Sequence, residues 1–170
     1  GPSKKNLLGL LRQLKIYIEN LSDSQETSTW GDYENNNFYY SRDIKIKKKI
    51  ISDYVKRKKP KILFDLGCNT GEFSEVAIKN GAEYVVGFDF DHGALRLAEK
   101  RAVKFKNRFL PLYLDASNPS PNLGWEQMER EGFIERSGKC DSLIALAFEH
   151  HLVISNNVPI KMFIKWLLSI

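Results

Sequence analysis

The fold is decided by the stretch Ile62-Leu63-Phe64-Asp65-Leu66-Gly67-Cys68-Asn69-Thr70-Gly71. Its apolar first half is typical of a buried strand, and the glycines that follow are typical of a turn. Apolar residues then recur at helical spacing up to Ile78, so a helix is expected directly after Gly71. Glycines let the backbone approach a ligand, and the first turn of a helix presents N–H groups without intrahelical partners. The stretch therefore predicts a nucleotide-type binding site.

Short apolar segments and helical patterns continue to alternate in the rest of the chain. Strands are expected at 61–66, 84–89, 109–114 and 141–147, and helices at 71–80, 92–105, 124–136 and 158–169. This alternation is typical of parallel βαβ units whose helices cover both faces of a sheet. The sequence thus predicts an α/β fold, a Rossmann-like doubly wound parallel sheet, as one domain over residues 61–170.

The first 60 residues follow a different pattern, which predicts helices at 5–21 and 42–57. Between the two helices lie five aromatic residues: Trp30, Tyr33, Phe38, Tyr39 and Tyr40. These rings either pack the N-terminal segment down or cover a pocket, since aromatic side chains line ligand sites well. In the second helix the side chains expected to face inward are Ile44, Ile46, Ile50, Ile51, Tyr54 and Val55. We therefore expect a helical and aromatic cap segment over residues 1–60.

The composition is that of a soluble globular protein, with 42% hydrophobic and 28% charged residues among 170. The net charge of +5 is uneven, because residues 1–61 hold 14 Lys and Arg against 7 Asp and Glu. This basic part is either a solvated helix surface or a contact for a phosphate-bearing or nucleic-acid partner. No apolar run reaches the roughly 20 residues that span a membrane. Two cysteines without disulfide or metal-ligand spacing fit a reducing compartment, so a cytoplasmic location is expected.

An acidic residue stands at or near the end of each expected strand. These residues are Asp65, Asp89, Asp115 and Glu149. In parallel sheets of this kind ligands bind outside the carboxyl ends of the strands. Asp89 follows Gly67 at about the spacing at which a carboxylate accepts hydrogen bonds from both ribose hydroxyls in dinucleotide sites. Alternatively, Asp89 caps the next helix, a role that Asp91 could also fill.

The glycine turn argues against a dinucleotide ligand. Pyrophosphate sites use the pattern G-x-G-x-x-G, which places the anion on a helix N-terminus. Here the pattern is Gly67-x-Asn69-x-Gly71, and Asp65 precedes it. An anionic pyrophosphate would gain nothing from Asp65, whereas a cationic or amine-bearing ligand would.

These residues resemble a known family. The stretch from Asp65 to Gly71 resembles the first motif of class I S-adenosylmethionine-dependent methyltransferases, and Asp89 and the pair Asp115-Ala116 match the next two motifs in position. The resemblance covers residues 60–170. Four further stretches are similar to a bacterial subgroup of nodulation-protein-like methyltransferases: 29–33, 118–125, 150–152 and 156–159.

The resemblance implies S-adenosyl-L-methionine as the cofactor and a role for each matching residue. Gly67 and Gly71 would pass close to its methionine part, with Asp65 near the ammonium group. Asp89 would hold the ribose hydroxyls. The residues expected around the adenine are Phe90 beside the ring, Asp115 at its amino group and the backbone N–H of Ala116. Asn69 belongs to the same binding turn and, with Cys68, is expected to shape it, although Cys68 as a nucleophile is the alternative.

Methyl transfer needs a base only if the acceptor must lose a proton. The expected position for such a base is the run Glu149-His150-His151, just past the fourth strand. Alternatively, one histidine packs or caps while the other faces solvent. No metal site is expected there, because adjacent residues do not readily converge on one ion.

The family's fold has seven strands, and the pattern accounts for four. The last strands are therefore expected to be missing, either because the chain is a piece of a longer protein or because another chain supplies them. The first functional hypothesis is methyl transfer to a small molecule. The alternatives are an RNA methyltransferase that uses the basic stretch 45–61, and a non-catalytic interaction protein that binds the cofactor.

Overall fold

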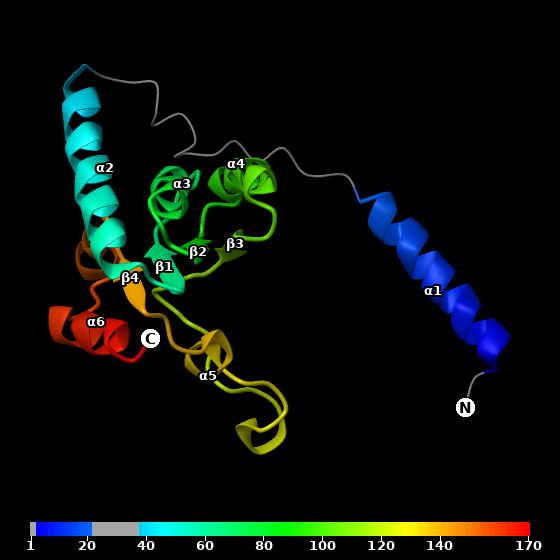
Figure 1. Ribbon diagram of the computed structural model, residues 1–170. Helices are drawn as coiled ribbons and strands as arrows, with labels where there is room; N and C mark the ends of the chain where they lie inside the picture. The colour runs from blue at the N-terminus through cyan, green and yellow to red at the C-terminus, as the bar shows by residue number, and fades with distance from the viewer. Residues whose placement is uncertain (1–2, 22–37) are drawn as a thin grey trace.

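The computed structural model describes residues 3–21 and 38–170, and for residues 38–41 it describes the backbone alone. The side chains of the predicted aromatic cluster lie outside these residues. Within the described part, the sheet has four parallel strands: β1 (Ile62–Leu66), β2 (Tyr84–Asp89), β3 (Phe109–Tyr113) and β4 (Ser142–Ile144). Their order is β3-β2-β1-β4 (Figure 1). The winding direction therefore changes between β1 and β4, which is where ligands bind in open α/β sheets.

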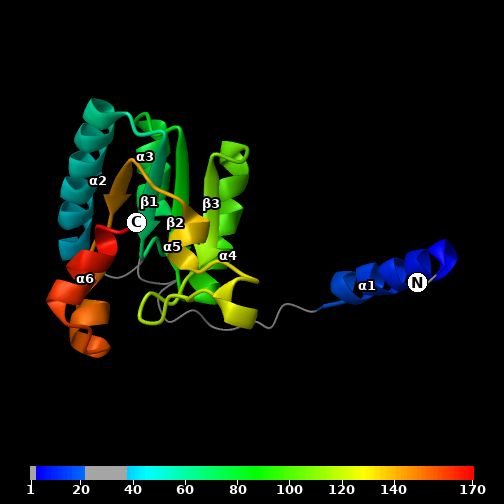
Figure 2. The same cartoon turned by 90° about the horizontal axis from the view of Figure 1, so that it is seen from below.

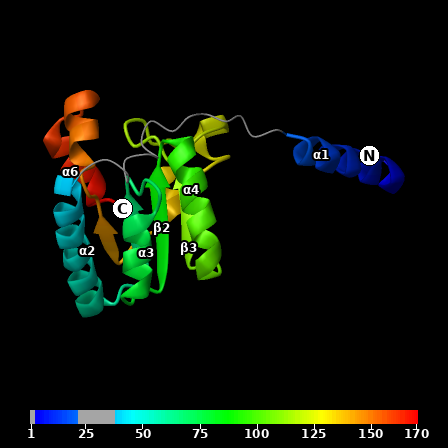
Figure 3. The same ribbon diagram turned by 90° about the horizontal axis from the view of Figure 1, so that it is seen from above.

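Helices cover both faces of this sheet (Figures 1, 2 and 3). α2 (Phe38–Lys58), α3 (Glu72–Lys79) and α4 (His92–Ala102) lie on one face, and α5 (Phe133–Ser137) and α6 (Ile160–Leu167) lie on the other. Side chains of β1 alternate between them, because Leu63 packs with Val55 and Ala77 while Phe64 packs with Phe88 and Phe133. A sheet buried on both faces explains the continuous apolar runs of its strands. The predicted Rossmann-like parallel sheet is confirmed.

The N-terminal helix α1 (Lys4–Glu19) is separate from this core. It begins at Ser3, whose hydroxyl oxygen accepts a hydrogen bond of 3.3 Å from the backbone N–H of Asn6. None of its residues is buried, and Figures 1 and 2 show it apart from the sheet. The predicted helix is thus present, and its apolar side is exposed in the described structure.

The helix predicted at 124–136 is wrong for most of its length. Only Phe133–Ser137 forms an α-helix, and Trp125–Gln127 forms one short 3-10 turn. Gly124, Glu126 and Gln127 have positive φ values of 85°, 51° and 60°, which a right-handed helix does not accommodate. An antiparallel bridge between Leu123 and Arg130 closes this segment into a loop instead.

The strand predicted at 141–147 is shorter than expected. β4 pairs only with β1, along Leu63, Phe64 and Asp65, and it ends at Ile144. Ala147 then adopts a left-handed conformation with φ of 53°, which turns the chain away from the sheet. A turn of π-helix, His151–Ser155, follows and was not predicted. The edge strand thus ends early, and the chain turns at Ala147 into the segment that contains the two histidines.

The inward side of α2 also differs in part from the expectation. Ile51 and Val55 are buried as predicted, whereas Ile46 and Ile50 are 50% and 61% exposed. The buried stripe runs in steps of one helical turn from Val55 through Ile51 to Lys47, which is half-buried. The side of α2 that faces the domain therefore carries a lysine in place of the expected isoleucines.

We predict that Gly71→Ala lowers the free energy of unfolding by about 2–4 kcal/mol, because of backbone strain and overpacking. Gly71 has φ of +80°, and a Cβ there would lie 2.6 Å from Cε1 of Phe109. Gly138→Ala is the control for backbone strain alone, since nothing lies within 4 Å of its added Cβ. Its φ of 67° with ψ of −159° is a conformation almost confined to glycine, so its expected loss is about 1–3 kcal/mol. Urea denaturation measures both, and a loss below about 1 kcal/mol in Gly71→Ala would show that Phe109 does not constrain the turn.

Candidate cofactor-binding site

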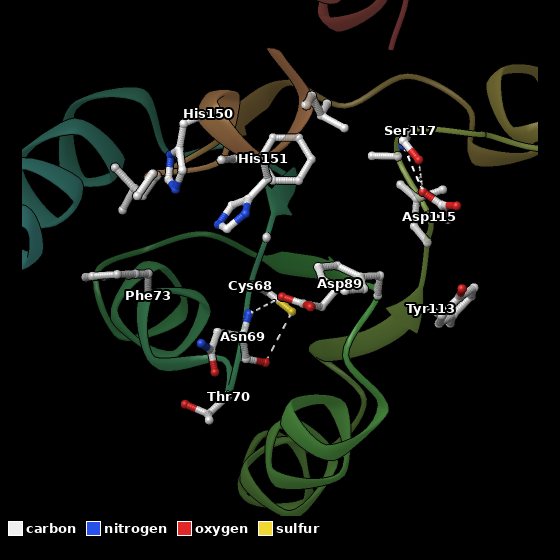
Figure 4. Close-up of a pocket in the computed structure, with 18 of the residues that line it drawn as sticks. Cys68, Asn69, Thr70, Phe73, Asp89, Tyr113, Asp115, Ser117, His150 and His151 are labelled. Atoms are coloured by element: carbon white, nitrogen blue, oxygen red, sulfur yellow. Dashed lines mark hydrogen bonds between the residues drawn. The ribbon is translucent and has the colours of Figure 1, made fainter. Parts of the chain in front are cut away.

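A pocket of about 440 Å³ lies at the carboxyl ends of the strands (Figure 4). Its lining includes eight of the predicted site residues: Gly67, Asn69, Asp89, Phe90, Asp115, Ala116, His150 and His151. The structure thus brings together residues from the ends of all four strands. Asp65, Gly71 and Glu149 do not line the pocket.

The floor of the pocket is the turn between β1 and α3. The backbone N–H groups of Gly67 and Cys68 both donate to the carbonyl oxygen of Phe88, at 2.8 and 3.0 Å. The N–H of Asn69 donates to Oδ2 of Asp89 at 2.7 Å. Gly67 has φ of +73°, and a Cβ there would lie 2.8 Å from Cδ2 of Phe148. The turn is therefore bonded to the end of β2 and has no room for a larger residue at Gly67.

Arg101 supports this turn from α4. Its Nε donates to the carbonyl oxygen of Thr70 at 2.9 Å, and its Nη1 donates to Glu75 on α3 at 2.6 Å. Glu75 also pairs with Lys79 at 2.5 Å. These ion pairs lower the pKa of Glu75, with the hydrogen bond from Lys79 as the largest cause. The turn and the start of α3 are thus held by a charged network outside the pocket.

Asp65 lies beneath the turn rather than in the pocket wall. It is buried, and the hydroxyl of Ser74 donates to its Oδ2 at 2.6 Å. The pKa of Asp65 is raised to about 7, chiefly by loss of solvation on burial and also by the nearby charge of Asp89, while the hydrogen bonds from Ser74 oppose the rise. The pKa of a buried carboxyl of this kind shifts when a charged group binds above it.

Asp89 stands between two backbone donors. Oδ2 accepts from Asn69, and Oδ1 accepts from the N–H of Asp91 at 3.0 Å. Burial raises the pKa of Asp89, while these backbone hydrogen bonds oppose the rise. Asp91 itself caps α4, since its side chain accepts from the N–H of Ala94 at 3.0 Å. The capping role considered for Asp89 therefore belongs to Asp91, and Asp89 faces the pocket.

One side of the pocket comes from the end of β3. Oδ1 of Asp115 accepts from the N–H and the hydroxyl of Ser117, at 2.9 and 2.6 Å, which leaves Oδ2 for a ligand. The ring of Tyr113 stacks on His92, with ring centroids 4.8 Å apart. Figure 4 shows Tyr113, Asp115 and Ser117 together on this side. Tyr113 was missed, although it directly precedes the strand end that drew attention to Asp115.

The opposite wall carries the two histidines. The rings of His150 and His151 lie 4.1 Å apart, and Figure 4 shows both on the pocket side that faces Asn69 and Asp89. Nδ2 of Asn156 donates to the carbonyl oxygen of His151 at 2.6 Å and closes the π-helical turn. Loss of solvation lowers the pKa of His151, and His150 lowers it further, while Asp89 and Glu149 oppose this. His151 is therefore biased towards the neutral imidazole, which can accept a proton.

Several lining residues were not predicted. They are Lys47, Thr70, Glu72, Phe73, Tyr113, Leu114, Ser117, Leu146, Ala147, Phe148, Leu152 and Asn156, and Cys68 was expected only to shape the turn. Most lie within two positions of a predicted site residue, so extending each predicted motif by two positions would have found them; Leu146 and Asn156 lie outside that range. Lys47 has no such signal, because it comes from α2 and reaches the pocket only through the tertiary packing of that helix.

A family model described as FtsJ-like methyltransferase matches residues 43–134. The chain belongs to the FtsJ-like methyltransferase family. The matched range runs from α2 into α5 and includes the β1–α3 turn and the ends of β2 and β3. The sequence resemblance to class I methyltransferases is thereby confirmed.

The chain also resembles a curated protein, nodulation protein NoeA of Rhizobium meliloti. The two are 46% identical over 162 residues, which are 95% of this chain and 34% of NoeA. The chain thus spans about a third of the length of this relative. The predicted similarity to the nodulation-protein-like subgroup is confirmed.

Solved structures give more distant likenesses. A protein of Pyrococcus horikoshii proposed to be an RNA methyltransferase has a TM-score of 0.46 at 17% identity, over 79% of this chain and 56% of that chain. The O-methyltransferase from Bacillus cereus in complex with SAH has a TM-score of 0.38 at 11% identity, over 66% of this chain and 44% of that chain.

Neither a membrane span nor a metal cluster occurs in the residues that the structure describes. No helix there is both long enough and apolar enough to cross a bilayer. No three His, Cys, Asp or Glu side chains in the same residues are grouped as metal ligands. Glu149 is exposed and does not line the pocket, whereas His150 and His151 do.

We predict that Asp65 makes the protein less stable as the pH rises from about 4 to about 7. In this window Asp65 of the unfolded chain releases its proton while Asp65 of the folded chain keeps it. Rising pH therefore stabilises the unfolded state relative to the folded state. At about 1.4 kcal/mol per pKa unit, the free energy of unfolding falls by roughly 4 kcal/mol across the window. Urea denaturation at both ends of the window measures it. Asp65→Asn should remove most of this slope, whereas Asp53→Asn on the exposed side of α2 should keep it. An unchanged slope in Asp65→Asn would contradict the assignment.

Proposed function

We propose that this chain is the cofactor-binding part of an S-adenosyl-L-methionine-dependent methyltransferase that acts on a small molecule. The observation that carries the proposal is the convergence of the β1–α3 turn, Asp89 and Asp115 on one pocket at the carboxyl ends of the strands. Asp89 is held there by the N–H groups of Asn69 and Asp91, and Asp115 is held by Ser117. Carboxylates fixed at neighbouring strand ends can accept hydrogen bonds from the hydroxyl and amino groups of an adenosyl cofactor.

The charges near the turn also fit a cationic ligand. Asp65 and Asp89 lie close enough that the negative charge of Asp89 raises the pKa of Asp65. A cation held above the turn would stabilise both carboxylates, whereas a pyrophosphate would be repelled. This supports an adenosyl sulfonium cofactor over a dinucleotide.

We assign the remaining cofactor groups to residues at the pocket and its floor. Asp89 would accept hydrogen bonds from the ribose hydroxyls, since it faces the pocket between the turn and β3. Phe90, which is 54% exposed, would lie against the adenine. Oδ2 of Asp115 would accept a hydrogen bond from the adenine amino group, and the backbone N–H of Ala116 would point towards the adenine ring. Gly67 and Gly71 shape the turn below the methionine part.

The cofactor supplies an activated methyl group, so the protein's work is positioning and the exclusion of water. His150 and His151 line the wall opposite Asn69, where an acceptor would approach. With its lowered pKa, His151 is neutral near pH 7 and can take the proton that an acceptor hydroxyl or amine loses. Glu149 would act on the histidines from outside the pocket rather than on the acceptor.

We predict that Asp89→Asn weakens binding of S-adenosylhomocysteine at least about tenfold, because hydrogen bonds to a charged acceptor contribute about 1.5–3 kcal/mol. Isothermal titration calorimetry of the wild-type chain and the variant measures this. Asp53→Asn is the control, since Asp53 is exposed on α2 away from the lining. Absence of binding to the folded wild-type chain would refute the proposed cofactor.

A second candidate is methyl transfer to RNA, favoured by the exposed basic residues of the stretch 45–61. These are Lys45, Lys49, Lys56, Arg57, Lys58, Lys59 and Lys61. The last five lie just before β1, whereas the pocket lies beyond the carboxyl end of β1, so most of the basic residues stand at the opposite end of the strands. This separation supports a small molecule as the first choice.

One experiment separates the catalytic hypotheses from a non-catalytic cofactor-binding protein. The chain is incubated with a methyl-labelled donor and cell extract, which is then fractionated into small molecules, RNA and protein. We expect label in the small-molecule fraction, and less of it with His151→Ala if a base is needed. Label in RNA would support the second candidate, and no transfer by a chain that binds the cofactor would support the non-catalytic one.

A further inference from the structure

The pocket extends beyond the residues assigned to the cofactor. Figure 4 shows Tyr113, Asp115 and Ser117 at one end and Phe73 and His150 at the other. The cofactor assignments account for the first end and for the middle, near Asn69. The second end is lined by Phe73 and His150, and Lys47 belongs to it because the neighbouring Lys48 on α2 pairs with Glu72, the residue next to Phe73. This end is where the methyl acceptor would lie, so its chemistry reports on the acceptor.

Lys47 is a cation directed into this end by the packing of α2. It lies one helical turn before Ile51, on the stripe that continues to the fully buried Val55. It is half-buried and lines the pocket, whereas Lys45 and Lys49 on the same helix are exposed and do not. The fold therefore selects one lysine of this basic helix for the pocket.

No carboxylate of the described residues forms a salt bridge with Lys47. The carboxylate of the lining that lies nearest in the fold is Glu72 on the first turn of α3, and it pairs with Lys48. Glu149 is exposed and outside the lining. Partly buried charges in proteins are normally paired, because loss of solvation is otherwise uncompensated. Among the described residues Lys47 therefore has no carboxylate partner, and its positive charge faces whatever occupies this end.

We propose that the methyl acceptor is a small molecule that carries an acidic group, a carboxylate or a phosphate, bound by Lys47. This rests on the proposed function, and it names the acceptor's chemical class. The acidic group lies against Lys47, an apolar part packs against Phe73, and the atom that receives the methyl group faces His150 and His151. The pocket is then divided by charge, with carboxylates near the sulfonium and ammonium groups of the cofactor and a cation at the acceptor's end.

The division of charge also favours a small acid over a nucleic acid. Lys45 and Lys49 are exposed on α2 outside the lining, and the basic residues at 56–61 lie at the opposite end of the strands. Among the lysines and arginines of the described residues, Lys47 is the one that lines the pocket. A single cation inside a pocket suits one acidic group, whereas binding of a polyanion uses several cations along its length.

The test uses two analogues of S-adenosylhomocysteine in which the sulfur is replaced by a nitrogen that bears an extra arm. The arm is carboxypropyl in one analogue and carbamoylpropyl in the other, so the two differ in charge and hardly in shape. We expect the wild-type chain to bind the carboxylate analogue about fivefold more tightly, the ratio that an accessible ion pair of about 1 kcal/mol gives. Arms of increasing length then locate the optimum.

Lys47→Gln should abolish this preference and leave the affinity for S-adenosylhomocysteine unchanged, and Lys49→Gln should retain the preference. Equal binding of the two analogues at every arm length overturns the proposal, as does a preference that survives in Lys47→Gln. Displacement of the carboxylate analogue by a short single-stranded RNA overturns the choice of a small acid. If S-adenosylhomocysteine itself fails to bind, the proposed function fails first, and that result is distinct from loss of the preference alone.

Discussion

The site depends on the hydrogen bonds that fix the β1–α3 turn to the end of β2. Two N–H groups of the turn share the carbonyl oxygen of Phe88, and a third meets the carboxylate of Asp89. The turn can take this path because Gly67 and Gly71 adopt positive φ values beneath Phe148 and Phe109. Everything else in the pocket is placed relative to this floor. The same bonds aim Asp89 at the space above the turn and leave Oδ1 of Asn69 without a donor.

The electrostatics of the site follow from that geometry. Asp65 and Asp89 are both brought out of water by the turn, and loss of solvation raises both pKa values. A site that holds two such carboxyls close together is less stable than its packing alone would make it, and binding of a cation relieves the conflict. Function and stability are thus opposed at this turn, as is common where a binding site is prepared in advance.

Much of this was predictable from the sequence. The strand–turn–helix at Asp65–Gly71 and the acids at the next two strand ends depend on local patterns that tertiary packing did not overrule, so the parallel sheet and the family were predictable. The segment 124–136 was not, because glycine and neighbouring residues with positive φ outweighed its helical spacing. Lys47 was not predictable either, since spacing alone could not say that Lys47, rather than Ile46 or Ile50, shares the inward side of α2 with Ile51.

The central claim is that the pocket holds an adenosyl cofactor across the floor formed by the turn. A crystal structure of the chain with S-adenosylhomocysteine tests it most directly. We predict both ribose hydroxyls within hydrogen-bond distance of Asp89, the methionine part over the turn at Gly67 and Asn69, and the sulfur facing His150 and His151. Ribose hydroxyls away from Asp89, or a ligand bound on another face of the sheet, would contradict it.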